Sequence, residues 1–465
     1  MRKILLVVAC AAAGCAVGPD YHRPSVEAPA AYRGGEVAPA PGSVADSGWW
    51  DVYGDAKLKA LITAALHGNP DLQAAIAHID EARALRGEAA LGLAPTVSAA
   101  GGIQRTKTSV DALLPGEPRF ADAESATVGV SYELDFWGRL RRTDEAARAA
   151  LLGSEYARRA VAVSLVAAVA SNYFTLLTLD SQLEIARRTV GTREKFVELT
   201  RAQHDRGYAT GLDVATAEAQ AALVRASIPD LERRIGETED QICALLGENP
   251  HAIDREHHGE EMPAAPPMPP AGLPSELLER RPDVLVAEAA LRAANANVGV
   301  AKAALFPTIS LTGLAGSLSS PLGALFRAPT AEWSAAAGIV QPLLDPQRSI
   351  YQVEVARART REALAQYGKA VQTAFQESAD ALLEYRKYGE FEQEQAKQVE
   401  AERRAAAIAL ARYRVGYASY FDVINADRDL FNAELGLSQA SANRLTALVR
   451  LYQVLGGGWQ DPPRS

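Results

Sequence analysis

The chain of 465 residues contains the same arrangement of segments twice. The segment Asn69–Leu72 (NPDL) returns as Arg281–Val284 (RPDV), 212 positions later. A second segment, Gly207–Val214 (GYATGLDV), returns 209 positions later as Gly416–Val423 (GYASYFDV). Internal repetition of this kind decides the fold class, so we expect each half to form the same elements in the same order.

Each half is predicted to contain a helix, two strands, a very long helix, a turn and a last helix. Residues 138–203 and 348–413 contain no proline, so each predicts one helix of roughly 65 residues and roughly 100 Å. Shorter helices are expected at about 56–93 and 212–246. A helix of roughly 65 residues does not fit inside a compact globule. The second long helix has the apolar 3–4 spacing of a coiled-coil seam at Ile350, Val353, Leu364, Tyr367, Val371 and Ala374.

The uncharged stretch Ala160–Leu179 resembles a transmembrane helix in length and composition. Its counterpart in the second half contains charged residues, among them Glu377, Asp380 and Arg386. Because two copies of one fold share an environment, we interpret Ala160–Leu179 as a buried face of a long helix.

The predicted strands begin at prolines. Pro95 and Pro307 each end a helix and open a threonine-containing extended run. Residues of Thr127–Phe136 then alternate between apolar and polar. This pattern suits a barrel wall between lipid and water, although a half-buried strand of a soluble sheet has the same alternation.

Four strands are too few to close a transmembrane barrel, since the smallest barrels have about eight. An open sheet edge in lipid leaves backbone groups without hydrogen bonds. Two, three or four copies of the chain would give about 8, 12 or 16 strands, and the strand count alone does not choose between them.

The N-terminus has the pattern of a bacterial lipoprotein signal. Arg2 and Lys3 precede the apolar run Ile4–Ala13, which is too short to cross a bilayer as a helix. Small residues lead to Cys15, so we predict cleavage before Cys15 and acylation of this residue. Cys10 is a second candidate with a shorter apolar run, and ordinary cleavage would leave Cys15 unmodified.

Two proline-rich segments divide the chain. Residues 250–274 contain seven prolines and residues 19–41 contain five, so neither forms a helix interior. Each is either a disordered linker or an irregular collar packed around helices. We therefore divide the sequence into a signal peptide (1–14), a lipid-anchored proline-rich segment (15–50), a first repeat (51–249), a proline-rich equatorial linker (250–274), a second repeat (275–456) and a C-terminal tail (457–465).

Composition and motifs exclude several functions. A net charge of −9 without a basic block argues against nucleic-acid binding, and a mean hydropathy of −0.09 argues against a polytopic helical membrane protein. Motifs for zinc hydrolysis, serine hydrolysis, and nucleotide or dinucleotide binding do not occur, so we expect neither an enzyme nor a cofactor. His251, His257 and His258 lack cysteine partners, and we interpret them as part of a solvated loop rather than a metal site.

Together these features resemble the TolC-like outer-membrane factor family, in its lipoprotein branch, over nearly all of the mature chain. The residues that carry the resemblance are Cys15–Tyr21, Leu277–Asp283, Phe306–Pro307, and Tyr413–Gly416 leading into Phe421–Val423. The resemblance implies a mainly α fold with a small β part. It also implies a homotrimer in the outer membrane, in which each chain gives four strands to a 12-stranded barrel and its helices to a periplasmic tunnel.

The function that this resemblance implies is the exit duct of a tripartite efflux pump. Small molecules would pass through it passively, with a periplasmic adaptor protein and an energy-supplying inner-membrane transporter as partners. A structural coiled-coil lipoprotein of the envelope and the exit duct of a protein secretion system remain as alternatives. The first alternative has no need of alternating strands.

The resemblance also implies a gate at the periplasmic tip. Asp213, Tyr413 and Asp422 occupy family gate positions, whereas Asn425 replaces a second acid and Ala418 a basic residue found in some members. Arg206, Arg414 and Arg428 are candidate replacements for that basic residue. For both aspartates, helix N-capping is an equally good interpretation. The adaptor is expected to dock on the two tip turns, at Gly207, Tyr208, Gly211, Gly416, Tyr417 and Ser419.

Overall fold

The computed structural model describes residues 16–29, 48–112, 114–116, 118–255, 262–266, 274–341 and 346–457. The chain forms two compact units, which we treat separately. Unit 1 contains the described residues of Met1–Ser25, His78–Glu155 and Val286–Gly368. Unit 2 contains those of Val26–Ala77, Tyr156–Leu285 and Lys369–Ser465.

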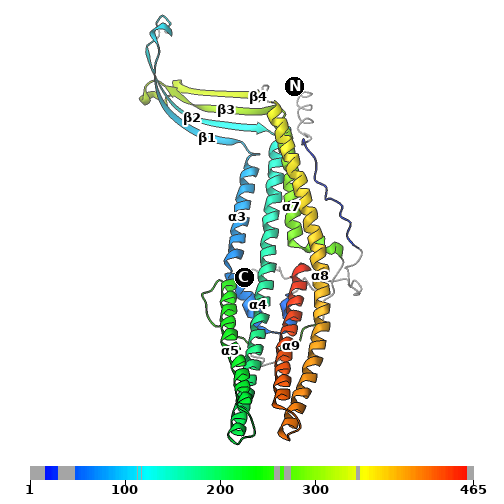
Figure 1. The fold of residues 1–465 in the computed structure, drawn as a ribbon. Helices are drawn as coiled ribbons and strands as arrows, with labels where there is room; N and C mark the ends of the chain where they lie inside the picture. Colours follow the sequence, from blue (N-terminus) through cyan, green and yellow to red (C-terminus); the bar gives the residue numbers. More distant parts are fainter. Residues whose placement is uncertain are drawn as a thin grey trace. The chain divides into compact units, whose positions relative to one another are not determined.

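The predicted order of elements is confirmed in both halves (Figure 1). One helix, two strands, a very long helix and a last helix follow one another as α3, β1, β2, α4 and α5, and again as α7, β3, β4, α8 and α9. The elements are η2 (Trp49–Tyr53), α2 (Ala56–Gly68), α3 (Pro70–Leu91), β1 (Thr96–Lys107), η3 (Val110–Ala112), β2 (Phe120–Leu134), α4 (Arg139–Asp205), α5 (Gly211–Leu246), η4 (Pro274–Glu276), α6 (Leu277–Arg280), α7 (Pro282–Ala303), β3 (Thr308–Ser319), η5 (Leu322–Ala324), η6 (Ala328–Thr330), β4 (Ala331–Val340), α8 (Pro346–Arg414) and α9 (Tyr420–Val454).

The four strands of unit 1 form one sheet in the order β1-β2-β3-β4, with every neighbouring pair antiparallel. The register runs from Thr96 opposite Ser131 to Lys107 opposite Phe120 between β1 and β2. Because β2 pairs with β3 only from Leu134 to Glu124, the end of the β1–β2 hairpin extends beyond β3 (Figure 1).

The described N-terminal segment is docked on the helices of unit 1. Val17 donates its N–H to Trp137 O at 3.0 Å, and a Cβ on Gly18 would lie 2.5 Å from the Cα of Gly299. Further along, the buried carboxylate of Glu288 accepts a hydrogen bond from Tyr21 Oη at 3.1 Å and pairs with Arg23 and Arg292. The buried charge therefore has partners on both the segment and its own helix.

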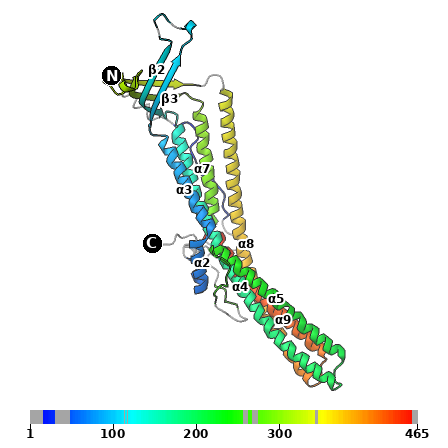
Figure 2. The ribbon, with the colours of Figure 1, turned by 90° about the vertical axis from the view of Figure 1, so that its left-hand side faces the viewer.

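Unit 2 contains two helical hairpins. Figures 1 and 2 show α5 beside the C-terminal part of α4, and α9 beside the C-terminal part of α8. Ion pairs cross each hairpin, and the residues involved are Arg187–Glu232, Glu194–Arg225 and Arg201–Glu218 in the first and Glu384–Arg450 and Glu392–Arg444 in the second. Each hairpin is thus held by ion pairs between its two helices as well as by its apolar face.

The core of unit 2 includes the apolar stretch of α4. Tyr173 and Phe174 are buried beside Ile242 of α5 and Tyr452 of α9. Helices α4 and α7 each contain an 18-residue window that is apolar enough to cross a membrane by composition. In α4, 61% of this window is buried inside the protein. The prediction that Ala160–Leu179 is a buried helix face is therefore confirmed.

The prediction of a single helix at 56–93 is wrong, because the helix is interrupted at Asn69, between α2 and α3. Asn69 has an extended backbone (ψ 125°), as steric contact with a following proline requires, and Pro70 starts the next helix. The expected seam of α8 is also only partly buried. Ile350 and Leu364 are 50% and 45% exposed in this chain, whereas Val353, Tyr367, Val371 and Ala374 are buried.

Candidate functional site

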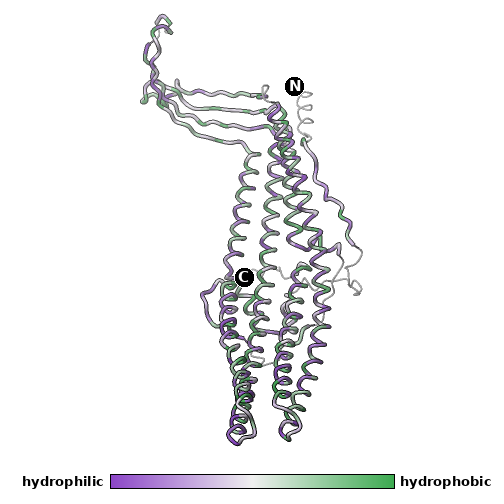
Figure 3. Tube along the Cα trace, viewed as in Figure 1, coloured by the Kyte–Doolittle hydropathy of each residue, from purple (hydrophilic) through white to green (hydrophobic). Residues whose placement is uncertain are grey.

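The sheet of unit 1 has one apolar and one polar face. Residues opposite each other on antiparallel strands share a face, so the register sorts the side chains. One face carries Val97, Ala99, Ile103, Val128, Val130, Ile309, Leu311, Trp333 and Ile339, and the other carries Ser98, Gln104, Thr106, Thr127, Ser131, Ser310, Thr312 and Ser334. The exceptions include Asp122 and Glu124 on the apolar face, near the hairpin end, and Leu314 and Leu318 on the polar face. Figure 3 shows hydrophobic and hydrophilic residues interleaved along the strands. The apolar face is exposed, with Ile103 at 77% and Trp333 at 80%.

Aromatic residues lie where the sheet meets the helices. The rings of Trp137 and Phe306 stack with centroids 4.6 Å apart, and Trp137 Nε1 donates to Pro307 O at 2.8 Å. Such residues are typical of a membrane–water boundary, because an apolar ring carries a polar group at its edge. The exposed apolar face and these aromatic residues fit a wall that faces lipid on one side and water on the other.

The wall of a single chain is incomplete. Strands β1 and β4 each pair on one side only, so both leave a row of backbone groups without a partner in the described sheet. In hydrocarbon such an edge is strongly unfavourable. The sheet therefore requires strands from other chains.

The two tip turns of unit 2 have the same local structure. Gly207 and Gly416 have φ angles of 77° and 80°, the left-handed region in which glycine ends a helix without strain. Tyr208 N donates to Gln203 O and Tyr417 N donates to Arg412 O, each at 2.8 Å. These bonds satisfy carbonyls that the end of a helix leaves free.

Each tip aspartate belongs to a capping box at the start of the following helix. Asp213 Oδ2 accepts hydrogen bonds from the N–H and the hydroxyl of Thr210, both at 2.7 Å. Asp422 Oδ2 accepts the corresponding bonds from Ser419 at 2.9 and 2.8 Å. These donors hold the pKa of both carboxyls below the usual value: chiefly the N–H of Thr210 for Asp213, and the hydroxyl of Ser419 for Asp422.

The other predicted gate residues lie near these caps. Tyr413 Oη donates to Gln203 Oε1 at 2.7 Å, so it joins the second hairpin to the first. Desolvation is the main cause that raises the pKa of Tyr413, and the nearby Asp213 carboxylate adds to it. Asn425 is half-buried one turn after Asp422. The structure thus brings Tyr413 close to Asp213 and gives both aspartates a capping role.

The candidate docking residues are at the very end of each hairpin. Tyr208 and Tyr417 are 83% and 78% exposed, and the equivalent apolar residues Leu212 and Phe421 are 76% and 68% exposed. Gly211 begins α5, and Ser419 is the N-cap of α9. Both tips therefore present an apolar pair to solvent.

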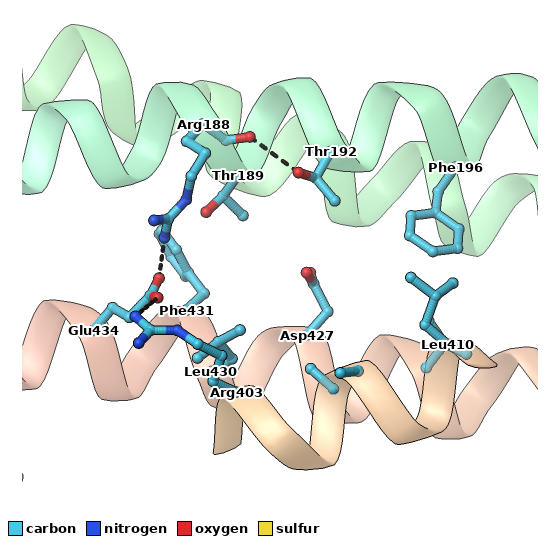
Figure 4. A pocket seen from close by; sticks show the side chains of 13 residues that line it. Arg188, Thr189, Thr192, Phe196, Arg403, Leu410, Asp427, Leu430, Phe431 and Glu434 are labelled. Carbon is cyan, nitrogen blue, oxygen red and sulfur yellow. Dashed lines mark hydrogen bonds and ion pairs between the residues drawn. The ribbon is translucent and has the colours of Figure 1, made fainter. Parts of the chain in front are cut away.

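Sequence reasoning missed a polar seam between the hairpins. A pocket of about 270 Å³ lies where α4, α8 and α9 meet. Figure 4 shows the Glu434 carboxylate between Arg188 of α4 and Arg403 of α8. Further toward the tip, the buried guanidinium of Arg193 donates to Asp427 Oδ2 at 2.8 Å and to Gln220 O at 2.9 Å.

Only the fold reveals these partners, because Arg193 and Asp427 are 234 positions apart with no motif around either. Of the candidate basic residues, Arg428 pairs with its neighbour Asp429 at 3.0 Å. The described residues contain no cluster of His, Cys, Asp or Glu side chains able to hold a metal ion. Cys15 lies outside the described residues, directly before the docked segment.

The comparisons with known proteins agree with this geometry. The family model for "Outer membrane efflux protein" matches residues 61–248 and 273–457. The toluene efflux pump outer membrane protein TtgC of Pseudomonas putida is 35% identical over 99% of this chain and 97% of its own length. The cation efflux system protein CusC of Escherichia coli is 32% identical over 98% of each chain. The solved structure of the outer-membrane channel OprN is 32% identical, covers 96% of this chain and 100% of its own, and superposes with a TM-score of 0.89.

Proposed function

Since this chain belongs to the outer membrane efflux protein family and is an outer-membrane efflux channel, we propose that three copies close one passive duct across that membrane. The observation that carries the proposal is the four-stranded sheet with an apolar face, a polar face and two unpaired edges. Three such sheets give about 12 strands, within the range known for outer-membrane barrels. The helices then continue as a tunnel in the periplasm.

Conductance tests this function. The purified protein should form water-filled channels in a planar bilayer, with all three copies contributing to one pore. A folded, monodisperse monomer in detergent would contradict the shared barrel, and a trimer without conductance would favour a structural envelope lipoprotein. We infer no catalytic step, since transport through a duct needs only a gradient or an energised partner.

We propose that the periplasmic tip gates the duct through Asp213, Tyr413, Asp422 and Asn425. The support is the bond from Tyr413 to Gln203, which ties the two hairpins together close to the Asp213 carboxylate. Three copies of each aspartate around a narrow mouth would focus a negative potential that favours cations. Asn425 leaves this ring with less charge than an acid would give.

The partners are proposed to be a periplasmic adaptor protein and an inner-membrane transporter. The exposed apolar pairs Tyr208/Leu212 and Tyr417/Phe421 support docking of the adaptor at both tip turns. Six such turns in a trimer would offer nearly equivalent sites. Changing Tyr208 and Tyr417 to Ser should weaken adaptor capture in a pull-down while leaving conductance unchanged, and unchanged capture would remove the tips as docking sites.

The anchor and the domain boundaries are also proposals. Acylation of Cys15 after removal of residues 1–14 is supported by the basic and apolar pattern before it. Palmitate labelling should disappear in Cys15→Ser. Residues 15–50 would be the anchored segment, 51–249 and 275–456 the two repeats, 250–274 the equatorial linker and 457–465 the tail.

A further inference from the structure

The apolar face of the sheet becomes charged at the end of the β1–β2 hairpin, where Asp122 and Glu124 of β2 share it with two cations of β1. Along β1 this face carries Val97, Ala99 and Ile103, and the next two residues on it are Arg105 and Lys107. Both lie beyond Glu124, the last residue of β2 that is paired with β3. The change therefore occurs on the two-stranded extension of the sheet (Figure 1).

An aromatic ring joins the two cations. Phe120 lies opposite Lys107, and its centroid is 5.6 Å from Arg105 Cζ and 5.8 Å from Lys107 Nζ. Asp122 pairs with Arg105 through a contact of 3.4 Å to its Nε, and the side chain of Arg105 remains 71% exposed. Among the described residues Lys107 has no acidic partner, so it is available to an anion.

The depth of these residues in a membrane follows from the strand geometry. A strand that rises about 3.4 Å per residue and tilts by about 40° advances about 2.6 Å per residue along the membrane normal. The part of β2 that pairs with β3, from Leu134 to Glu124, then spans about 26 Å, close to the apolar band of about 25 Å in outer-membrane barrels. Arg105 and Lys107 lie about 5 and 10 Å beyond Ile103, at the depth of lipid headgroups.

We propose that Arg105 and Lys107, joined by Phe120, bind the phosphate of a lipid headgroup in the outer leaflet of the outer membrane. The hairpin is on the outer side, because the other end of the sheet continues into the periplasmic helices. An arginine fork donates two N–H groups to phosphate oxygens and a lysine supplies a compact charge, while the ring of Phe120 packs against both cations. The inference rests on the outer-membrane location and not on the proposed gate or partners.

The experiment uses the full-length protein in nanodiscs of phosphatidylcholine. The probe is lipid A with both phosphates, and the comparison lipid is the same molecule without phosphate. Lipid retention is measured by native mass spectrometry for the wild-type protein and for Arg105→Gln/Lys107→Gln. We expect the double variant to bind the phosphorylated lipid about 10-fold or more weakly, since it loses two charge-assisted contacts to the phosphate.

Two controls make the result specific. Arg119→Gln removes a cation from the same hairpin but from a residue that directly precedes β2 and is outside the paired register. Arg105→Gln/Thr106→Arg keeps the net charge and moves it to the polar face. We expect retention close to wild type for the first and about as low as in Arg105→Gln alone for the second.

Equal retention of the phosphorylated lipid by wild type and the double variant would overturn the proposal, as would an equal loss for the lipid without phosphate. Competition by millimolar inorganic phosphate would show an ordinary soluble-anion site and would also overturn it. Heat-resistant trimers on a gel confirm that the variants fold, and unchanged conductance separates this outcome from a failure of the channel.

Discussion

The two repeats use the same backbone geometry at equivalent points but different side chains to hold it. In the first repeat, the amide of Asn69 donates to Leu245 O at 2.9 Å. In the second, the guanidinium of the equivalent residue, Arg281, donates to Val454 O at 3.2 Å. Each side chain thus ties the break between two helices to the last turn of the repeat's final helix.

The difference lies in the surrounding charge. Arg281 is buried and also pairs with Asp283 and Glu377, each at 2.6 Å. Asn69 instead satisfies a backbone donor, Leu72 N, with its carbonyl oxygen at 3.0 Å. Both repeats therefore keep the same contact between the helix break and the last turn of the final helix. The side chain that makes this contact differs, because its other partners are carboxylates in one repeat and a backbone N–H in the other.

The largest loss of stability should come from substituting Arg281, the charged member of the two equivalent residues. Arg281→Met removes a buried guanidinium that pairs with two partly exposed carboxylates and donates to the buried carbonyl of Val454, so we expect a loss of about 2–3 kcal/mol in the free energy of unfolding. Asn69→Ala leaves one donor and one acceptor unpaired and should cost about 1–2 kcal/mol. Urea unfolding measures both, with the exposed Arg357→Met, which removes a helical pair, as a control within about 0.5 kcal/mol. Equal losses in the first two variants would refute the distinction.

The tips should respond alike where the repeats are alike. Gly207→Ala and Gly416→Ala each force a side chain into the left-handed region, and we expect a loss of about 1–2 kcal/mol in both. Gly236→Ala is the matched control, because Gly236 lies inside α5 with open space around it and alanine favours a helix. A clear difference between the two tip variants would show that their turns are not equivalent.

Substitutions at the second tip distinguish helix capping by Asp422 from a role of its charge in the gate. Ser419→Ala removes the cap donor but keeps the carboxylate, whereas Asp422→Asn keeps the shape but removes the charge. Both should reduce the stability of the helix slightly, because each removes part of the capping box. We expect only Asp422→Asn to lower cation selectivity, measured as reversal potential in a salt gradient, and Asn425→Asp to raise it. Unchanged selectivity in all three variants would leave Asp422 as a cap alone.

The smallest expected effect is a loss of thermal stability at low pH. The folded-state pKa of Asp213 and of Asp422 is depressed, so each cap stabilises the fold above the unfolded pKa, about 3.9, and loses that contribution as the pH falls through the lower folded value. We expect the melting temperature to fall slightly in that range. The fall should be smaller in Asp213→Asn/Asp422→Asn, and an identical pH profile would assign it to other carboxylates.

Much of the fold was predictable because its determinants are local. Proline-free stretches, the alternation along β2, and the glycine–aspartate pattern of both tips each act within a few residues. A feature that occurs at equivalent positions in both halves supports the same element twice. The break at Asn69 was predictable in principle, because Pro70 disfavours a helical residue before it.

Long-range partners were not predictable in the same way. The pairing of Arg193 with Asp427, and the sharing of Glu434 by Arg188 and Arg403, depend on how two hairpins meet. Single charged residues on a helix look alike in sequence whether they face solvent or a seam. The partners of Glu288 on the N-terminal segment likewise become visible only after that segment is docked.

The unpaired edges β1 and β4 have a genetic consequence. A chain whose β4 cannot pair still offers an intact β1, so it can enter a ring and prevent its closure. If intact and defective chains were made in equal amounts and mixed freely, about one ring in eight would contain intact chains alone. Alleles that damage an edge strand should therefore be dominant over the wild-type copy, whereas alleles that abolish the whole chain should be recessive.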